Sequence, residues 1–360
     1  MRDLAIMLKP ASSLCNLRCS YCFYETVAEN RSVYSRGIMT ADTAQRILAN
    51  IFCDLDPGDH ISFAFQGGEP TLAGLGFFRE FVLRVQQINP GCEISYQLQT
   101  NGILLDDSWG EFLKMYDFLV GLSLDCLQPV HDGNRKDGAG QGTFARVMKA
   151  KEYLERWQID YNVLATLTRE LAAQPEKVWE FIWHNKIRFV QFTPCFGDMP
   201  GAICPEDFAR FYGRLIPLWY NAWEKGVYIS VKLIDDLVTL LATGRITACG
   251  LTGNCAPQII VEADGSVYPC DFFATDSWEI GNLCHHSIKE IYEAPRQTQF
   301  RGRKRQLPLC ENCRYKAICG GNCPVMQRHI CYGKDDSACG RQQLLDRHIK
   351  ILLSVARQLR

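Results

Sequence analysis

Cys15-Asn-Leu-Arg-Cys19-Ser-Tyr-Cys22 is the most specific pattern in this 360-residue chain, and it comes soon after the apolar run Leu4-Ala-Ile-Met-Leu8. The apolar run predicts a buried strand, which places the three cysteines in the loop that follows it. Three thiolates can hold three irons of a four-iron cluster, and the missing fourth ligand leaves one iron open for a substrate or cofactor. A structural zinc site needs four closed ligands, and no nearby His or Cys supplies the fourth. An open iron-sulfur cluster is therefore the better interpretation.

Further strand-like runs recur along the first two-thirds of the chain. They are apolar, β-branched or aromatic, and they lie at residues 61–65, 94–98, 118–124, 161–167 and 189–192. Helical patterns lie between them, and the clearest begins after Thr40, a plausible N-cap. Strand then helix, repeated about six times, predicts an α/β protein whose parallel sheet is wound as a barrel or part of one. In such a sheet the chemistry sits in loops at the carboxyl ends of the strands.

The strand-helix alternation stops near residue 240. From there the chain runs through short loops rich in Cys, Gly and Asn and closes with an amphipathic helix. We expect a partial (β/α)6 barrel, similar to a TIM barrel, over residues 1–235, a cysteine-rich domain over 236–345 and a C-terminal helix over 346–360.

Composition narrows the classes of function. The 39 Lys and Arg residues balance 40 Asp and Glu residues, and a net charge of -1 gives no sign of a face for nucleic acid or membrane. No apolar run approaches the roughly 20 residues of a membrane span, and the first residues do not resemble a signal peptide. We therefore expect a cytoplasmic protein without nucleic-acid or membrane partners.

Cysteine usage is the unusual feature of the composition. The chain has 18 cysteines, which in a reducing compartment are better explained by metal or cluster ligation than by disulfides. Three of them lie between Cys15 and Cys22 and ten between Cys249 and Cys339. This distribution predicts two separate metal regions.

The first cysteine group resembles the radical SAM superfamily, whose hallmark is a CX3CX2C loop with an aromatic residue before the last cysteine, here Tyr21. The resemblance implies that the open iron binds S-adenosylmethionine and that the cofactor is cleaved to a 5'-deoxyadenosyl radical. Gln66-Gly67-Gly68-Glu69-Pro70 matches the family's GGEP motif and follows a predicted strand, where glycines permit close backbone approach. By the same resemblance the S-adenosylmethionine pocket is lined by Tyr21, Gly68, Ser123, Arg135 and the backbone of Phe196. Alone, the Gly-Gly turn would be ordinary, and Ser123 would be no more than a turn residue.

The second cysteine group resembles the SPASM extension of radical SAM enzymes, which carries two auxiliary four-iron clusters. Cys255 is followed by nine residues, Gly265, four residues and Cys270, and later come Cys310-X2-Cys313-X5-Cys319-X3-Cys323 and Cys339. With Cys249 added, eight thiolates are available, and two fully ligated clusters need eight. The family pattern assigns the inner cluster to Cys249, Cys255, Cys270 and Cys323, and the outer cluster to Cys310, Cys313, Cys319 and Cys339. A zinc site at Cys310–Cys323 is the alternative, and Cys331 competes with Cys339 as the last ligand.

Several longer stretches resemble anaerobic sulfatase-maturating enzymes: KPASSLCNLRCSYCFY, FAFQGGEPTLAGL, LQTNG, GLSLD, NRKD and DGSVYPCDF. The resemblance implies oxidation of a cysteine or serine of a sulfatase to Cα-formylglycine, with three four-iron clusters and an electron donor such as flavodoxin or ferredoxin. It also implies that Asp271 is the base that removes the proton of the target side chain. Cys126-Leu127 stands where the family usually has Gly-Pro, so the local turn and the choice of substrate can differ.

Two other functions remain open at this point. A radical enzyme that crosslinks a ribosomal peptide shares these motifs, although such an enzyme often has a leader-binding domain before the cluster loop, and here that loop begins at Cys15. A plain electron carrier would need neither an open cluster nor a cofactor pocket at Gly68 and Arg135. Formylglycine formation is thus the leading hypothesis.

Overall fold

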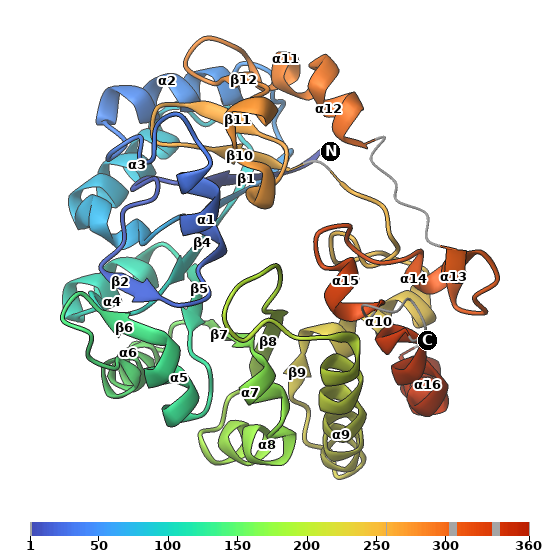
Figure 1. Cartoon of the computed structure of the whole chain (residues 1–360). Helices are drawn as coiled ribbons and strands as arrows, with labels where there is room; N and C mark the ends of the chain where they lie inside the picture. Colours follow the sequence, from blue (N-terminus) through green and yellow to red (C-terminus); the bar gives the residue numbers. More distant parts are fainter. Residues whose placement is uncertain (1, 257, 302–307, 333–338, 360) are drawn as a thin grey trace. The chain divides into compact units, whose positions relative to one another are not determined.

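The structure is a computed structural model and describes residues 2–256, 258–301, 308–332 and 339–359 (Figure 1). The chain forms two compact units. The first comprises Met1–Ser123, Arg135–Tyr161 and Pro257–Gly302, and the second comprises Leu124–Asn134, Asn162–Ala256 and Arg303–Arg360. In the described part of the chain, no helix is both long and apolar enough to cross a membrane.

The first unit is built on parallel strands that alternate with helices. In spatial order the strands are β1 (Asp3–Leu8), β3 (His60–Phe65), β4 (Glu93–Thr100) and β5 (Phe118–Ser123). The intervening helices are α2 (Ala41–Phe52), α3 (Gly74–Ile88) and α4 (Asp107–Met115), with α6 (Phe144–Arg156) after β5. Thr40 caps α2 as expected, because its side chain accepts a hydrogen bond from Thr43 N. The predicted strands and the α/β class are confirmed.

Three further strands of the first unit come from the cysteine-rich part of the sequence. Strand β10 (Ile259–Val261) pairs in parallel with β1, on the side opposite β3, and β11 (Ser266–Tyr268) and β12 (Gly281–Asn282) continue antiparallel. The turns η2 (Asp271–Phe273) and η3 (Asp276–Trp278) and the helices α11 (Ile288–Glu293) and α12 (Pro295–Arg301) complete it. Pairing of β1 with β10 places residues some 250 positions apart in sequence on neighbouring strands of the sheet (Figure 1).

Short elements surround the cysteine loop of the first unit. Strand β2 (Leu17–Cys19) pairs antiparallel with β6 (Arg135–Asp137), α1 (Phe23–Glu29) follows the last cysteine, and η1 (Pro70–Ala73) follows the GGEP turn. None of these short elements is visible as a periodic pattern in the sequence.

The second unit repeats the strand-helix alternation and ends in helices. It contains β7 (Tyr161–Leu167), β8 (Phe189–Pro194) and β9 (Ser230–Val231), which pair in parallel in that order. Its helices are α5 (Gln128–Asn134), α7 (Arg169–Ala172), α8 (Pro175–His184), α9 (Pro205–Glu224), α10 (Lys232–Thr243), α13 (Pro308–Glu311), α14 (Lys316–Cys319), α15 (Gln327–Ile330) and α16 (Gly340–Gln358). The C-terminal helix α16 packs against α9 and α10 and begins directly after Cys339.

Candidate active site and cluster-binding cysteines

The GGEP turn holds the cysteine loop of the first unit in place. Gly68 N donates to Ser12 O at 2.8 Å, and Glu69 N donates to Leu14 O at 2.8 Å. A Cβ on Gly68 would lie 2.2 Å from Leu14 O, so this close approach of two backbones requires glycine. The sequence predicted close approach of a ligand at this turn, and the structure shows that the chain's own cysteine loop approaches it.

The carboxylate of Glu69 ties the same turn to the next strand end. It is buried and accepts hydrogen bonds from Thr71 Oγ1 at 2.6 Å, Thr100 Oγ1 at 2.7 Å and Asn101 N at 2.8 Å. Asn101 in turn donates to Asn16 Oδ1 at 2.8 Å, inside the cysteine loop. The motifs at the ends of β3 and β4 are therefore one hydrogen-bonded framework around the loop, which fixes the direction of its thiols.

Arg135 and Tyr21 lie beside the three cysteines. The β2–β6 ladder pairs Cys19 with Arg135, and the guanidinium carbon of Arg135 lies 5.4 Å from the centre of the Tyr21 ring. Arg135 is largely buried, so its charge acts in a region of low dielectric. Ser123 ends β5 and accepts a hydrogen bond from Gln99 Nε2 at 3.1 Å. Phe196 follows β8 and belongs to the second unit.

Two thiols of the loop, those of Cys15 and Cys22, are protonated when no iron is bound. Burial raises the pKa of Cys15 to about 12, and burial also raises the pKa of Cys22. Iron binds thiolates, so cluster assembly here must release protons. The loop thus has the right ligands, but it is not a reactive-thiol site by itself.

Asp271 lies in the same unit, near the point where the cysteine loop leads into α1. The turn η2 packs against α1, and the rings of Phe272 and Phe23 meet edge to face with centres 4.9 Å apart. Phe23 directly follows Cys22, and Phe272 directly follows Asp271. Pairing of β1 with β10 is what brings these two distant segments together.

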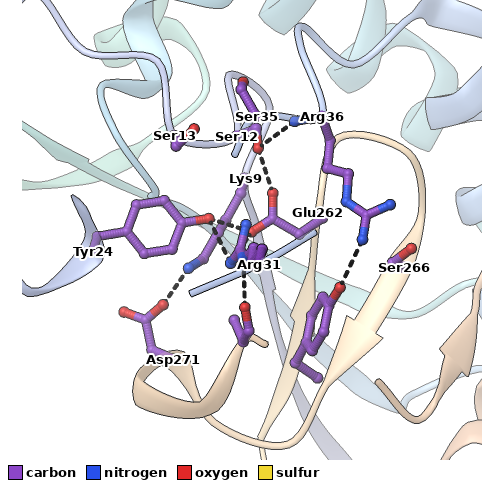
Figure 2. A network of polar contacts seen from close by, with 12 residues as sticks. Lys9, Ser12, Ser13, Tyr24, Arg31, Ser35, Arg36, Glu262, Ser266 and Asp271 are labelled. Atoms are coloured by element: carbon purple, nitrogen blue, oxygen red, sulfur yellow. Dashed lines mark hydrogen bonds and ion pairs between the residues drawn. The ribbon is translucent and has the colours of Figure 1, made fainter. Parts of the chain in front are cut away.

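A network of buried charges holds the Asp271 carboxylate (Figure 2). Lys9 Nζ forms an ion pair with Asp271 Oδ1, and Gln66 Nε2 donates to Asp271 Oδ2 at 3.0 Å. Lys9 is fully buried, and its ammonium lies 3.5 Å from the centre of the Tyr24 ring. Such a cation over an aromatic face is stabilised when it is removed from water.

The second carboxylate of this network is Glu262, at the end of β10. It accepts from Ser12 Oγ at 2.8 Å, from Arg31 Nη2 at 2.9 Å and from the Tyr24 hydroxyl. Burial by itself raises the pKa of Glu262, but Lys9 and Arg31 outweigh burial and hold this pKa below its ordinary value. Two buried cations thus balance two buried carboxylates, which is the condition under which buried charge is tolerated.

Sequence reasoning missed Lys9, Gln66, Tyr24, Arg31 and Glu262 as parts of the site. A signal was present for Lys9 and Glu262, since each charged residue directly follows a short apolar strand. The partners of these charges could not be read from the sequence because they are more than 200 positions apart.

In the second unit, five cysteines line one small cavity. They are Cys310, Cys313, Cys319, Cys331 and Cys339, and the cavity is also lined by Tyr315, Arg341 and Leu345. The structure therefore brings together the four cysteines predicted for the outer cluster, and it adds the competitor Cys331. Hydrogen bonding from the Cys331 thiol lowers the pKa values of both Cys319 and Cys339.

Three of the cysteines predicted for the inner cluster also belong to the second unit. Cys249 and Cys323 are close enough to influence each other electrostatically, and a Cβ on Gly250 would lie 2.7 Å from Cys323 Cβ. Cys255 follows in the same loop, whereas Cys270 belongs to the first unit. Among residues 2–256, 258–301, 308–332 and 339–359, no three His, Cys, Asp or Glu side chains are grouped so as to hold one metal ion.

The turn after β5 holds its unusual cysteine in a left-handed backbone conformation. Cys126 has φ = +62°, a backbone conformation that glycine adopts most easily. Its side chain is fully buried. The neighbouring Asp125 accepts a hydrogen bond from Thr166 N at 2.8 Å. Cys126 therefore sits in a turn that suits the glycine usual in the family.

Two family models match the chain. The radical SAM superfamily matches residues 10–172, and the SPASM iron-sulfur cluster-binding domain matches residues 249–314. Together with the cysteine loop and the thiol cavity they define a radical SAM enzyme with a SPASM domain, and they imply iron-sulfur clusters and S-adenosylmethionine as cofactors.

Individual relatives identify the family. The chain is 36% identical over 347 residues to the cysteine-type anaerobic sulfatase-maturating enzyme of Clostridium perfringens, covering 94% of this chain and 92% of that protein. It is 28% identical over 345 residues to the serine-type enzyme of Klebsiella aerogenes, covering 93% and 82%. A solved structure of native anSMEcpe with bound AdoMet and Cp18Cys peptide superposes with a TM-score of 0.91 at 33% identity, covering 99% of this chain and 100% of that one. The chain belongs to the family of anaerobic sulfatase-maturating enzymes.

Proposed function

We propose that this chain oxidises a cysteine or serine of a sulfatase to Cα-formylglycine, using a radical generated from S-adenosylmethionine. The observation that carries the proposal is the buried carboxylate of Asp271, held next to the segment that follows the open cysteine loop. The family provides the reaction, because the relatives named above are sulfatase-maturating enzymes along nearly their whole length.

The cofactor-binding residues follow the sequence predictions. We assign the open cluster to Cys15, Cys19 and Cys22, the inner auxiliary cluster to Cys249, Cys255, Cys270 and Cys323, and the outer one to Cys310, Cys313, Cys319 and Cys339. We assign the S-adenosylmethionine pocket to Tyr21, Gly68, Ser123, Arg135 and the backbone of Phe196. The largely buried guanidinium of Arg135 supports this assignment, since it suits a carboxylate ligand.

The lining of the thiol cavity suits an anionic cluster. Arg341 lines this cavity and is almost fully buried, yet its Nε and Nη1 have no hydrogen-bond partner among the described residues. Buried charged donors without partners are costly, so the cavity suits a negatively charged occupant. Four thiolates around a four-iron core make such an anion.

When bound, the cofactors supply a 5'-deoxyadenosyl radical that removes a hydrogen atom from the target β-carbon and a cluster that accepts one electron. The chain's own contribution is to take the side-chain proton of the target. Asp271 has two oxygens, each engaged once, and a carboxylate has further acceptor positions on both. Lys9 and Gln66 hold the carboxylate rigid, which is what a general base requires.

Removal of a hydrogen atom, a proton and an electron from the target residue accounts for the product. The target loses one hydrogen atom from carbon, one proton from sulfur or oxygen and one electron, which converts the single carbon-sulfur or carbon-oxygen bond into a double bond. A serine target gives the aldehyde directly. A cysteine target gives a thioaldehyde, which water hydrolyses to the aldehyde with release of hydrogen sulfide.

Cysteine is the favoured target residue. The chain is 36% identical to a cysteine-type relative and 28% identical to a serine-type relative over similar lengths. We further propose a sulfatase as the protein partner and flavodoxin or ferredoxin as the electron donor.

An anaerobic assay with peptide substrates tests the function. The reconstituted protein is incubated with S-adenosylmethionine, a reductant and a sulfatase peptide containing Cys-X-Pro-X-Arg, its serine version, or an alanine version as control. Mass spectrometry should show the cysteine peptide exchanging sulfur and two hydrogens for one oxygen, and the serine peptide losing two hydrogens more slowly. A cysteine peptide that loses two hydrogens but keeps its sulfur would indicate a crosslink and move the assignment to the peptide-crosslinking alternative.

A further inference from the structure

Arg341 occupies a position that is unfavourable for a cation. It is the second residue of α16, a helix of 19 residues, and the N-terminal end of a helix carries partial positive charge. Its side chain is only 1% exposed, so water does not compensate for this. No ion pair joins Arg341 to any carboxylate in the described ranges, and its Nε and Nη1 have no hydrogen-bond partner there.

The groups around Arg341 indicate what offsets the free-energy cost of burying its charge. The side chain lines the cavity formed by the five thiols, Cys319 among them. Cys339, the N-cap of α16, accepts from Gln342 N at 3.4 Å, so the helix end itself also faces a cysteine. The cation and the helix terminus therefore converge on the same thiols.

We propose that Arg341 is the charge-compensating residue of the outer auxiliary cluster: it stabilises the bound cluster and raises its reduction potential. This inference rests on the proposed function, because it requires a cluster on Cys310, Cys313, Cys319 and Cys339. Net charge and hydrogen bonds to sulfur set the potential of an iron-sulfur cluster, and a buried cation favours the more negative, reduced state.

Arg314 does not share this role. Arg314 is also close in sequence to the thiol cavity, but its side chain is 65% exposed and paired with Asp346 on α16. Water and the carboxylate screen its charge, so its effect on the cavity is small. Arg314 therefore offers a matched control on the same unit.

The experiment is a redox titration of the anaerobically reconstituted full chain, followed by electron paramagnetic resonance, with iron counted in every sample. The double variant Cys310→Ala/Cys313→Ala lacks two proposed ligands of the outer cluster. The resonance signal and the iron that are missing from this variant are therefore those of the outer cluster. We expect Arg341→Gln either to shift that signal alone to a more negative potential or to lose the outer iron selectively. Arg341→Lys should retain full iron and shift less, and Arg314→Gln should not shift.

Different results would overturn different statements. An Arg341→Gln protein with full iron and an unchanged or more positive outer potential excludes the role of Arg341. If Arg341→Gln loses all auxiliary iron, Arg341→Lys decides, because it keeps the positive charge: the same loss of iron in that variant excludes the role. If Cys310→Ala/Cys313→Ala retains all of its iron, the outer cluster itself is misassigned, which is a separate failure of the proposed function.

Discussion

The surroundings of Asp271 and the thiol cavity near α16 both place charged groups away from water, but only near Asp271 do the described residues pair each buried cation with a carboxylate. Around Asp271, the cations Lys9 and Arg31 are each paired with a carboxylate. In the thiol cavity, no described carboxylate pairs with Arg341, and its buried Nε and Nη1 have no hydrogen-bond partner among the described residues.

This difference indicates which part of the site exists before the cofactors bind. The charges near Asp271 form two ion pairs within the chain, and Arg31 Nη1 is their one buried nitrogen without a hydrogen-bond partner among the described residues, so that region can fold and hold its geometry unaided. The thiol cavity holds an unbalanced cation and groups that favour metal, so its stability should depend on the cluster. Variants near Asp271 should therefore alter chemistry or folding directly, whereas variants in the cavity should alter cluster content.

The largest effect is expected from removing the open-cluster ligands, on which both regions depend for turnover. The variant Cys15→Ala/Cys19→Ala/Cys22→Ala should abolish cleavage of S-adenosylmethionine, measured as 5'-deoxyadenosine. Iron should fall from about twelve to about eight per chain, since the auxiliary ligands are untouched. The matched control Cys53→Ala/Cys92→Ala/Cys284→Ala removes three cysteines outside the predicted sets and should cleave normally. Cleavage by the first variant would contradict the assignment of the open cluster.

Replacing Asp271 by asparagine should uncouple the reaction. The expected loss of formylglycine is roughly a hundredfold or more, as removal of a general base commonly causes. Formation of 5'-deoxyadenosine and the iron content should remain, because the open cluster is not altered. Asp276→Asn is the control, since Asp276 lies in the same segment, where its carboxylate accepts from the exposed Ser32 N–H at 2.6 Å and pairs with Arg36 at 3.8 Å. An Asp271→Asn enzyme that forms product at the normal rate would remove Asp271 from the mechanism.

Lys9→Met tests whether the charges near Asp271 are balanced as a unit. The substitution leaves Asp271 and Glu262 with one buried cation between them, and breaking a buried pair costs about 3–5 kcal/mol of unfolding free energy. Lys151→Met gives a comparison, because Lys151 is also largely buried but its partner Glu155 is 43% exposed. That i,i+4 pair should contribute about 0.3–0.5 kcal/mol. Denaturant unfolding of the two variants should differ accordingly, and equal stabilities would show that the network near Asp271 is not a balanced unit.

Much of the fold could be predicted from the sequence because its signals are local. Strands at residues 61–65 and 161–167, for example, are short runs rich in apolar, β-branched and aromatic residues, and β3 and β7 confirm them almost residue for residue. Local glycine and cysteine patterns likewise predicted the loop at Cys15–Cys22 and the turn at Gly68. The C-terminal helix begins at Gly340, directly after its N-cap Cys339, and it contains the apolar residues Leu344 and Leu345 on which its prediction rested.

The rest depends on long-range pairing, which leaves no periodic signal. Joining of β10 to β1 adds residues 257–302 to the first unit and thereby makes Lys9 a partner of Asp271. Arg341 gave no signal either, since an arginine in a helix is ordinary until its burial is known.

The smallest effect is expected from replacing Cys331, the fifth thiol of the cavity. Comparing this variant with one at Cys339 decides which of the two cysteines is the last ligand of the outer cluster. Cys339 is the N-cap of α16 and accepts from Gln342 N, so hydrogen bonding and the helix terminus favour its thiolate. Cys331 is fully buried and donates to Gly321 O at 3.6 Å, and hydrogen bonds to Cys319 and Cys339 together with burial raise its pKa well above the ordinary value. Cys339→Ala should therefore lose about four irons per chain, whereas Cys331→Ala should keep the full content. Iron and sulfide analysis of the two variants, prepared side by side, measures this. Loss of iron in Cys331→Ala with retention in Cys339→Ala would reverse the assignment and make Cys331 the ligand.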